Sequence, residues 1–214
     1  MRRITVVDYG IVNLGNVVRG FECVGARVDV SVDPDTVRQA ELLVLPGVGA
    51  FAAGMAELAS RNLDSAVIEA VEAGTPLLGI CLGMQMLMEH SEENGKYDGL
   101  GIISGDVTAI PPDGVNVNGQ RKVPHIGWNA LELPPTRDSW QRSCLANAEY
   151  GEFCYFVHSY MATPSDPSRV LAQCEYDGLA ICAAVIQENV TGLQFHPERS
   201  GPEGLKILAE FAKS

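Results

Sequence analysis

The chain has 214 residues, 46% of them hydrophobic and 20% charged, which suits a globular protein with a sizeable core. Fifteen lysines and arginines stand against 27 acidic residues, so the formal net charge is −12. Nucleic-acid backbones and anionic lipid surfaces would repel such a chain, and we expect neither nucleic acid nor a membrane as a partner.

Strand and helix signals alternate along the first ninety residues. Apolar and β-rich runs predict strands, and segments with helical periodicity lie between them. The expected strands are 4–9, 27–32, 41–45 and 75–80, and the expected helical segments are 15–24, 51–73 with a break near Arg61-Asn62, and 82–90. Because strands separated by helices pair in parallel, the sequence predicts an α/β fold with a doubly wound, mostly parallel sheet flanked by helices.

The rest of the chain has a different pattern. Residues 91–120 are rich in Gly, Asp, Asn and Pro, which predicts loops with one short strand at Val107–Ile110. Strand signals then follow one another at 122–133, 152–162, 169–176, 179–187 and 191–195, before an amphipathic helix at 201–213. This succession predicts antiparallel additions that make the main sheet mixed, or an additional smaller antiparallel sheet. We expect one domain spanning 1–214, since no long linker interrupts the pattern.

Targeting and cysteine patterns point to a cytoplasmic protein. The apolar run Ile4–Val7 is too short for a signal-peptide core, and the longest apolar stretch, Pro76–Met88, is too short to span a bilayer. None of the six cysteines forms a C-x-x-C pair, so we expect reduced thiols, no metal site and no cofactor.

Cys81 lies in the segment Gly79-Ile80-Cys81-Leu82-Gly83, between a predicted strand and a predicted helix. This is the G-x-nucleophile-x-G elbow with cysteine in place of serine. The glycines permit a sharp turn, and a sulfur at a helix start is favoured as thiolate. The N–H of Leu82 is placed to meet an oxyanion. A buried structural cysteine at a tight turn is the alternative, and this motif alone does not decide between the two.

His196-Pro197-Glu198 directly follows the strand predicted at 191–195. Residues two apart in an extended chain face the same side, so His196 and Glu198 can face one site. A cysteine nucleophile needs a base, and the base needs an acceptor that fixes its tautomer. A plain polar turn is the alternative, but both motifs end predicted strands, where open α/β sheets have their active sites. The sequence therefore predicts a catalytic triad of Cys81, His196 and Glu198.

These motifs resemble those of the class I (triad-type) glutamine amidotransferases. The segment Pro46-Gly47-Val48-Gly49 resembles the oxyanion strand of that family, so the resemblance implies that backbone N–H groups of Val48 and Gly49 join that of Leu82. Within the family, further segments resemble the glutaminase subunits of imidazole glycerol phosphate synthases, in histidine biosynthesis. They are Asp8-Tyr9-Gly10 with Asn13-Leu14, Pro124-His125-Ile126-Gly127-Trp128-Asn129, and Phe156-Val157-His158-Ser159-Tyr160. The resemblance extends from residue 4 to about 200.

The resemblance implies that L-glutamine is hydrolysed through a Cys81 thioester, and that the ammonia passes to a cyclase subunit of (β/α)₈ barrel fold in a heterodimer. The expected substrate-binding residues are Gly49, Gln85, His158, Ser159 and Tyr160. The expected partner-facing residues are Asn13, Asn16, His125, Trp128 and Arg199. The sequence departs from the family at Arg199, where lysine is expected, and arginine changes the geometry of any ion pair there. It also departs at Ile126, where methionine is usual.

Other functions compete with this interpretation. The chain could serve another class I amidotransferase, act as a stand-alone cysteine hydrolase of γ-glutamyl substrates, or be a catalytically silent scaffold. The segments 124–129 and 156–160 argue against the first of these, and the complete set of Cys, His and Glu argues against the last. Glycines on both sides of Val48 would let a peptide turn, so we also expect the partner to gate the activity.

Overall fold

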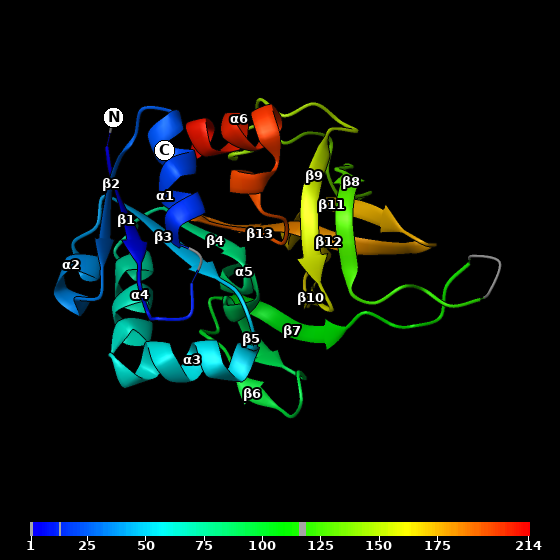
Figure 1. Ribbon diagram of the computed structural model, residues 1–214, viewed down its shortest axis with the longest axis horizontal. Helices are drawn as coiled ribbons and strands as arrows, with labels where there is room; N and C mark the ends of the chain where they lie inside the picture. Colours follow the sequence, from blue (N-terminus) through cyan, green and yellow to red (C-terminus); the bar gives the residue numbers. More distant parts are fainter. Residues whose placement is uncertain (1, 13, 116–118) are drawn as a thin grey trace.

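The computed structural model describes residues 2–12, 14–115 and 119–214, and a seven-stranded sheet forms its centre (Figure 1). The strand order is β11-β12-β13-β4-β3-β1-β2. Five neighbouring strands run parallel: β1 (Arg3–Val7), β2 (Arg27–Ser31), β3 (Leu42–Gly47), β4 (Leu77–Cys81) and β13 (Val190–Leu193). At one edge, β12 (Leu179–Gln187) and β11 (Val170–Tyr176) continue the sheet antiparallel. The expected mixed, mostly parallel sheet is confirmed.

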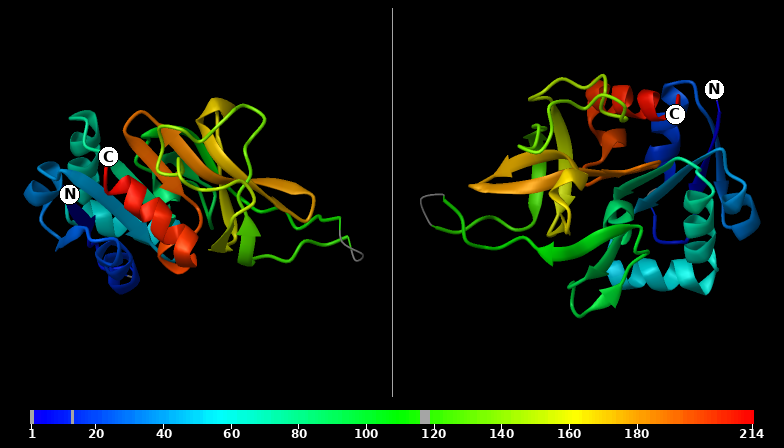
Figure 2. Two further views of the ribbon diagram at one scale, coloured as in Figure 1. Left: turned by 90° about the horizontal axis from the view of Figure 1, so that it is seen from above. Right: turned by 180° about the vertical axis from the view of Figure 1, so that it is seen from behind.

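Helices cover both faces of this sheet (Figure 2). One layer contains α1 (Leu14–Cys23) and α6 (Gly201–Phe211), and the other contains α3 (Phe51–Ser60), α4 (Leu63–Glu72) and the short α5 (Leu82–Met86). Alternate residues of each strand serve the two layers: Leu42 and Val44 pack in the α1–α6 core, whereas Leu43 and Leu45 pack in the core beneath α3 and α4. This double burial explains why the parallel strands are apolar runs rather than alternating sequences.

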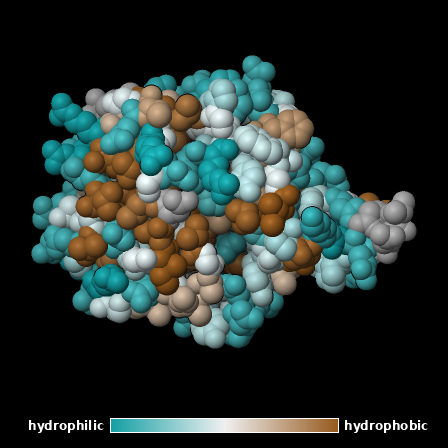
Figure 3. Space-filling view, viewed as in Figure 1, coloured by the Kyte–Doolittle hydropathy of each residue, from teal (hydrophilic) through white to brown (hydrophobic). Residues whose placement is uncertain are grey.

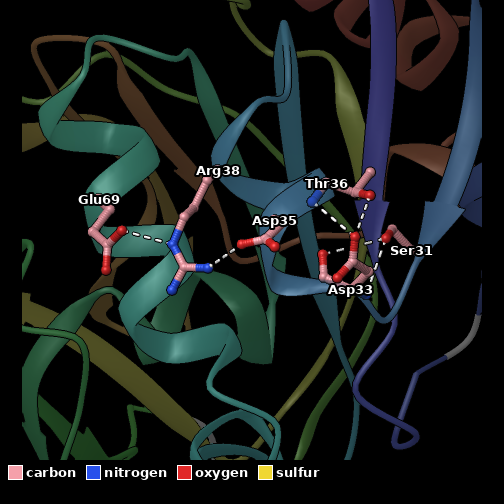
Figure 4. A network of polar contacts seen from close by, with 6 residues as sticks. All are labelled: Ser31, Asp33, Asp35, Thr36, Arg38 and Glu69. Carbon is pink, nitrogen blue, oxygen red and sulfur yellow. Dashed lines mark hydrogen bonds and ion pairs between the residues drawn. The ribbon is translucent and has the colours of Figure 1, made fainter.

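A helix that the sequence interpretation missed, α2 (Pro34–Arg38), follows β2. The Asp33 carboxylate accepts hydrogen bonds from the backbone N–H and hydroxyl of Thr36, and Pro34 occupies the first turn, as at many helix starts. Arg38 joins the helix to α4 through Glu69, 2.6 Å away, and also pairs with Asp35 (Figure 4). These ion pairs are partly exposed, so they fix the position of α2 more than they stabilise the fold.

Two smaller sheets lie beside the main one. A four-stranded sheet has the order β10 (Tyr160–Pro164), β7 (Ile103–Ala109), β5 (Met88–Ser91) and β6 (Tyr97–Asp98). A two-stranded antiparallel sheet pairs β8 (His125–Ala130) with β9 (Phe153–His158). The expected smaller antiparallel region is confirmed, although β5 and β7 pair in parallel. Single-turn helices η1 (Pro167–Arg169) and η2 (Pro197–Arg199) complete the described elements.

Two predicted elements were wrong. The helix expected at 82–90 ends at Met86, because N–H groups of Leu100 and Ile103 take the carbonyls of Met86 and Leu87 that a longer helix would need. The strand expected at 152–162 is interrupted at Ser159, between β9 and β10. No helix in the described part of the chain is long and apolar enough to cross a membrane.

Candidate active site

Cys81 ends β4 in a strained turn. Its backbone has φ 55° and ψ −111°, a region that residues other than glycine rarely adopt. The chain around it is packed too closely for side chains: a Cβ on Gly83 would stand 1.8 Å from the Leu45 carbonyl oxygen, and one on Gly79 would stand 2.9 Å from backbone atoms of Gly83. Gly83 is therefore required by the approach of α5 to β3, and Gly79 by the approach of α5 to β4.

Three adjacent parallel strands end at the same place in the sheet. Gly47 of β3 lies opposite Cys81 of β4, and Ile80 of β4 lies opposite Leu193 of β13, three residues before His196. Segments from three distant parts of the sequence are thus brought to one edge. This edge is the position at which open α/β sheets bind ligands.

His196 lies between the Glu198 carboxylate and Cys81, the predicted nucleophile. Its Nδ1 is 2.7 Å from Oε1 of Glu198, whose side chain is only 1% exposed. Burial alone would lower the pKa of this ring, but the Cys81 sulfur and the Glu198 carboxylate raise the pKa of His196 to about 10. Its Nε2 makes no hydrogen bond of ordinary length and angle, although Cys81 is close enough to act on the ring. The ring can therefore hold a proton beside the sulfur and exchange it with a reacting group.

Ser200, which the sequence interpretation did not select, holds the His196 backbone. Its hydroxyl donates to the His196 carbonyl at 2.7 Å and accepts the Tyr155 N–H at 3.0 Å, while the His196 N–H donates to the Tyr155 carbonyl. These three hydrogen bonds connect His196, the predicted base, to β9 directly and through Ser200. Ser200 is 1% exposed, so water does not compete for them.

A cleft of about 420 Å³ opens in front of Cys81. It is lined by the predicted residues Val48, Gly49, Cys81, Leu82, Gln85, His158, Ser159, Tyr160 and His196, together with Glu93, Pro124 and Val157. The expected oxyanion and substrate residues are therefore gathered around the nucleophile. Glu198 lies behind His196, outside the lining. Glu93 was not predicted; its carboxylate accepts the Phe51 N–H at the start of α3.

A pair of glutamines connects the floor of the cleft to the nucleophile. Gln85 donates from Nε2 to the Tyr160 carbonyl and to Oε1 of Gln194, both at 3.0 Å. Gln194 is fully buried, and its Nε2 lies 3.9 Å from the Cys81 sulfur. Gln194 was missed because a glutamine within a strand carries no signal of its own.

Tyr9 supports the predicted oxyanion strand from beneath. Its hydroxyl donates to the Pro46 carbonyl at 2.9 Å, and a Cβ on Gly47 would stand 2.5 Å from that hydroxyl oxygen. Burial, and then the charge of Cys81, raise the pKa of Tyr9 far above its ordinary value, so it stays a hydrogen-bond donor. Gly49, at the mouth of the cleft, has φ +90°.

The sheet of β8 and β9 presents an exposed face beside the cleft. Trp128 is 54% exposed and meets the Tyr155 ring edge-on, and the exposed Arg199 guanidinium lies 4.4 Å from the centre of that ring. Asn16 is half-buried on α1. Asn13, the remaining residue expected to face a partner, lies outside the described residues.

The expectation that His125 faces a partner was wrong. Successive side chains of a strand alternate between its faces, and β8 exposes Ile126 and Trp128, so His125 points inward. It is 2% exposed and stacks between Phe156 and Tyr176, with ring centres 4.9 and 4.0 Å away. Its partner is another histidine, His158.

Four of the five other cysteines are buried and do not line the cleft. Burial raises the pKa of the thiols of Cys144, Cys154, Cys174 and Cys182 to about 12, which leaves them uncharged at neutral pH. Within the described ranges, no group of three or more His, Cys, Asp or Glu residues could hold a metal ion.

Comparison with known proteins places these features in a family. The model of the family "Glutamine amidotransferase class-I" matches residues 5–214. Imidazole glycerol phosphate synthase subunit HisH 1 of Legionella pneumophila (strain Lens) is 44% identical over 212 residues, which cover 99% of each chain. The HisH subunit of Syntrophotalea carbinolica is 45% identical over 97% of this chain and 98% of its own. The solved structure of PurLQS from Thermotoga maritima shares the fold, with a TM-score of 0.70 at 22% identity over 100% of this chain and 98% of that one.

Proposed function

This chain belongs to the class-I glutamine amidotransferase family, and we propose that it is the glutaminase subunit of an imidazole glycerol phosphate synthase. Relatives that carry this name match nearly the whole chain at 44–45% identity. The observation that carries the proposal is the cleft in which Cys81 meets His196, with Glu198 behind it. Its substrate is L-glutamine, and its products are glutamate and ammonia.

In the proposed reaction, the Cys81 sulfur attacks the side-chain amide carbon of glutamine. A carbon–sulfur bond forms, and the carbonyl oxygen becomes an oxyanion. The carbon–nitrogen bond then breaks, and His196 gives its proton to the departing ammonia. Water, deprotonated by His196, next attacks the thioester and releases glutamate with regeneration of the thiol. Glu198 keeps the ring oriented and stabilises its positive charge.

Backbone groups would stabilise the oxyanion. The Leu82 N–H starts α5 and has no partner within that helix, and Val48 and Gly49 line the same cleft. We assign the second donor to the Val48–Gly49 segment. One such donor is worth roughly 10²–10³ in turnover. Rotation of one peptide flanked by glycines, when the partner docks, would therefore suffice to gate the activity.

Glu93 supports glutamine as the substrate. It is the acidic residue among those that line the cleft, and its carboxylate is fixed by the Phe51 N–H at 2.6 Å. A glutamine bound with its amide at Cys81 carries an ammonium group at its other end. We assign the recognition of that ammonium to Glu93, and we assign contacts to the rest of the substrate to Gln85, Ser159 and Tyr160.

The partner in this proposal is a cyclase subunit of (β/α)₈ barrel fold, in a heterodimer that consumes the ammonia. The exposed face of β8 and β9 supports a docking surface here, since Trp128, Ile126 and Phe153 are each more than half exposed. Figure 3, in the orientation of Figure 1, shows hydrophobic side chains gathered on the left and centre of this face of the molecule. Large exposed hydrophobic patches of this kind often mark protein interaction sites.

We further propose that the chain forms a single domain. We also propose a cytoplasmic location, which the absence of disulfides between the described cysteines supports.

Glutaminase assays test the proposal. The chain should hydrolyse glutamine slowly alone, faster with the cyclase, and fastest with the cyclase and its nucleotide substrate. Cys81→Ala should abolish hydrolysis, while added ammonia should still sustain the cyclase without this chain. Full activity of the isolated chain would favour a stand-alone hydrolase instead. Activation only by the partner of another amidotransferase would assign the chain to that pathway.

A further inference from the structure

Two histidines lie side by side between the cleft, which His158 lines, and the exposed face of β8. His125 Nδ1 is 3.0 Å from His158 Nε2, and their side chains belong to residues only 2% and 6% exposed. Burial lowers the pKa of each ring to about 4, so both are uncharged at neutral pH. The reaction described above uses neither ring.

The surrounding groups fix which atom of each ring carries the proton. His158 Nδ1 is 2.9 Å from the Tyr160 carbonyl, which can only accept, so Nδ1 donates and Nε2 is left as an acceptor. His125 must then donate from Nδ1 to His158. Its own Nε2 is an acceptor that faces the Asn129 amide nitrogen at 3.4 Å. That amide is oriented independently, because its nitrogen donates to the Glu175 carbonyl at 2.8 Å and its oxygen accepts the Ala130 N–H.

The hydrogen bonds therefore run in one direction, from Asn129 through His125 and His158 to the Tyr160 carbonyl. That carbonyl also accepts from Gln85, so two donors fix its orientation. Tyr160 follows Ser159, where β9 ends and β10 begins, and both residues form part of the wall of the cleft. The position of this wall thus depends on a ring, His125, that does not line the cleft.

We propose that His125 is a positioning residue of the glutaminase: it holds His158 as a donor to the Tyr160 carbonyl and thereby sets the Ser159–Tyr160 wall that receives glutamine. The inference rests on the proposed function. Each of the four ring nitrogens faces a hydrogen-bond partner, and a buried polar group costs stability when it loses that partner, so the chain depends on every member. Because the wall contacts the substrate rather than the reacting sulfur, loss of the pair should raise KM more than it lowers kcat.

Two substitutions of His125 separate this role from simple packing. The amide nitrogen of asparagine occupies the place of a histidine Nδ1, whereas that of glutamine occupies the place of Nε2. We expect His125→Asn, measured in the complex with the cyclase, to keep KM for glutamine within about threefold of the wild-type value. His125→Gln should raise KM by roughly 5- to 100-fold, as expected when a buried acceptor loses its donor, with kcat nearly retained. His90→Asn and His90→Gln, on the partly exposed β5, are the matched controls.

Equal KM values for the two His125 variants at equal melting temperatures would overturn the proposal. A second measurement does not depend on activity or on the variants folding. In ¹⁵N-histidine-labelled wild-type chain, NMR should find the proton of both His125 and His158 on Nδ1. A proton on Nε2 of His158 would overturn the proposal even if the kinetics agreed. If the wild-type complex hydrolysed no glutamine, the proposed function would fail, and the NMR result would still decide whether the relay exists.

Discussion

Gly83→Ala would test whether the elbow needs its close backbone approach. A Cβ at this position would stand 1.8 Å from the Leu45 carbonyl oxygen, where 3.0 Å is the shortest ordinary contact. Strand β3 and helix α5 would have to separate by the difference, about 1.2 Å. Overpacking of this kind typically costs about 1–3 kcal/mol of folding free energy.

The same displacement reaches the reacting groups, because Gly83 follows Cys81 and Leu82 directly. A misplacement of about 1 Å in a catalytic site can cost ~10²-fold in rate. We therefore expect Gly83→Ala to lower the free energy of unfolding by about 2 kcal/mol and to lower glutaminase kcat roughly a hundredfold. KM should change less, since Gly83 does not line the cleft.

Urea unfolding of the isolated chain and glutaminase kinetics of the complex measure the two effects. Gly15→Ala, in α1, is the matched control for stability: among the described residues, no atom outside its own stretch of helix lies within 4 Å of the added Cβ. Alanine there should stabilise the helix by about 1 kcal/mol. A Gly83→Ala variant with wild-type stability and with kcat within threefold of wild type would refute the reasoning.

Three further predictions concern the triad and the buried histidines. An electrophilic glutamine analogue should label Cys81 alone of the six cysteines; label found mainly on another thiol by peptide mapping would contradict the assignment. His196→Ala should lower kcat by roughly 10²–10⁴, and Glu198→Ala by less, because the glutamate only orients the ring; equal losses at unchanged stability would refute these roles. The free energy of unfolding should fall as pH drops from about 6.5 to 4, by up to roughly 3 kcal/mol per ring, because the unfolded chain protonates His125 and His158 first. It should also fall as pH rises from 6.5 toward 10, where His196 loses a proton that only the fold retains. Urea titrations across pH 4–10 measure both limbs, and a flat profile would count against these shifts.

The sequence predicted the central sheet well because its signals are local. The apolar runs of β1, β3 and β4 are buried on both faces, and the break expected near Arg61-Asn62 occurs where Asn62 adopts φ 56° between α3 and α4. The helix expected at 82–90 was wrong because distant N–H groups take its carbonyls, and nothing in the segment itself shows that competition. The helix α2 could have been found from Asp33-Pro34, a short but regular helix start.

The distinction between local signals and long-range contacts also explains which residues of the site could be predicted. Cys81 and His196 lie in short sequence motifs, so both could be predicted from residue type and spacing alone. Gln194 and Ser200 act through contacts with residues far away in the sequence, Cys81 and Tyr155 respectively. The error at His125 has a simple origin, since residues an odd number apart on a strand face opposite sides, and Trp128 is three residues away.

The place of β13 in the sheet determines the stage of folding at which the enzyme can become active. This strand is synthesised after every other strand of the chain, yet it lies between β12 and β4. It must enter a gap between earlier-made elements, and such long-range pairing is slow to form. Until it does, His196 is not beside Cys81. A nascent or partly folded chain therefore cannot release ammonia, and the enzyme becomes active only when its folding is complete.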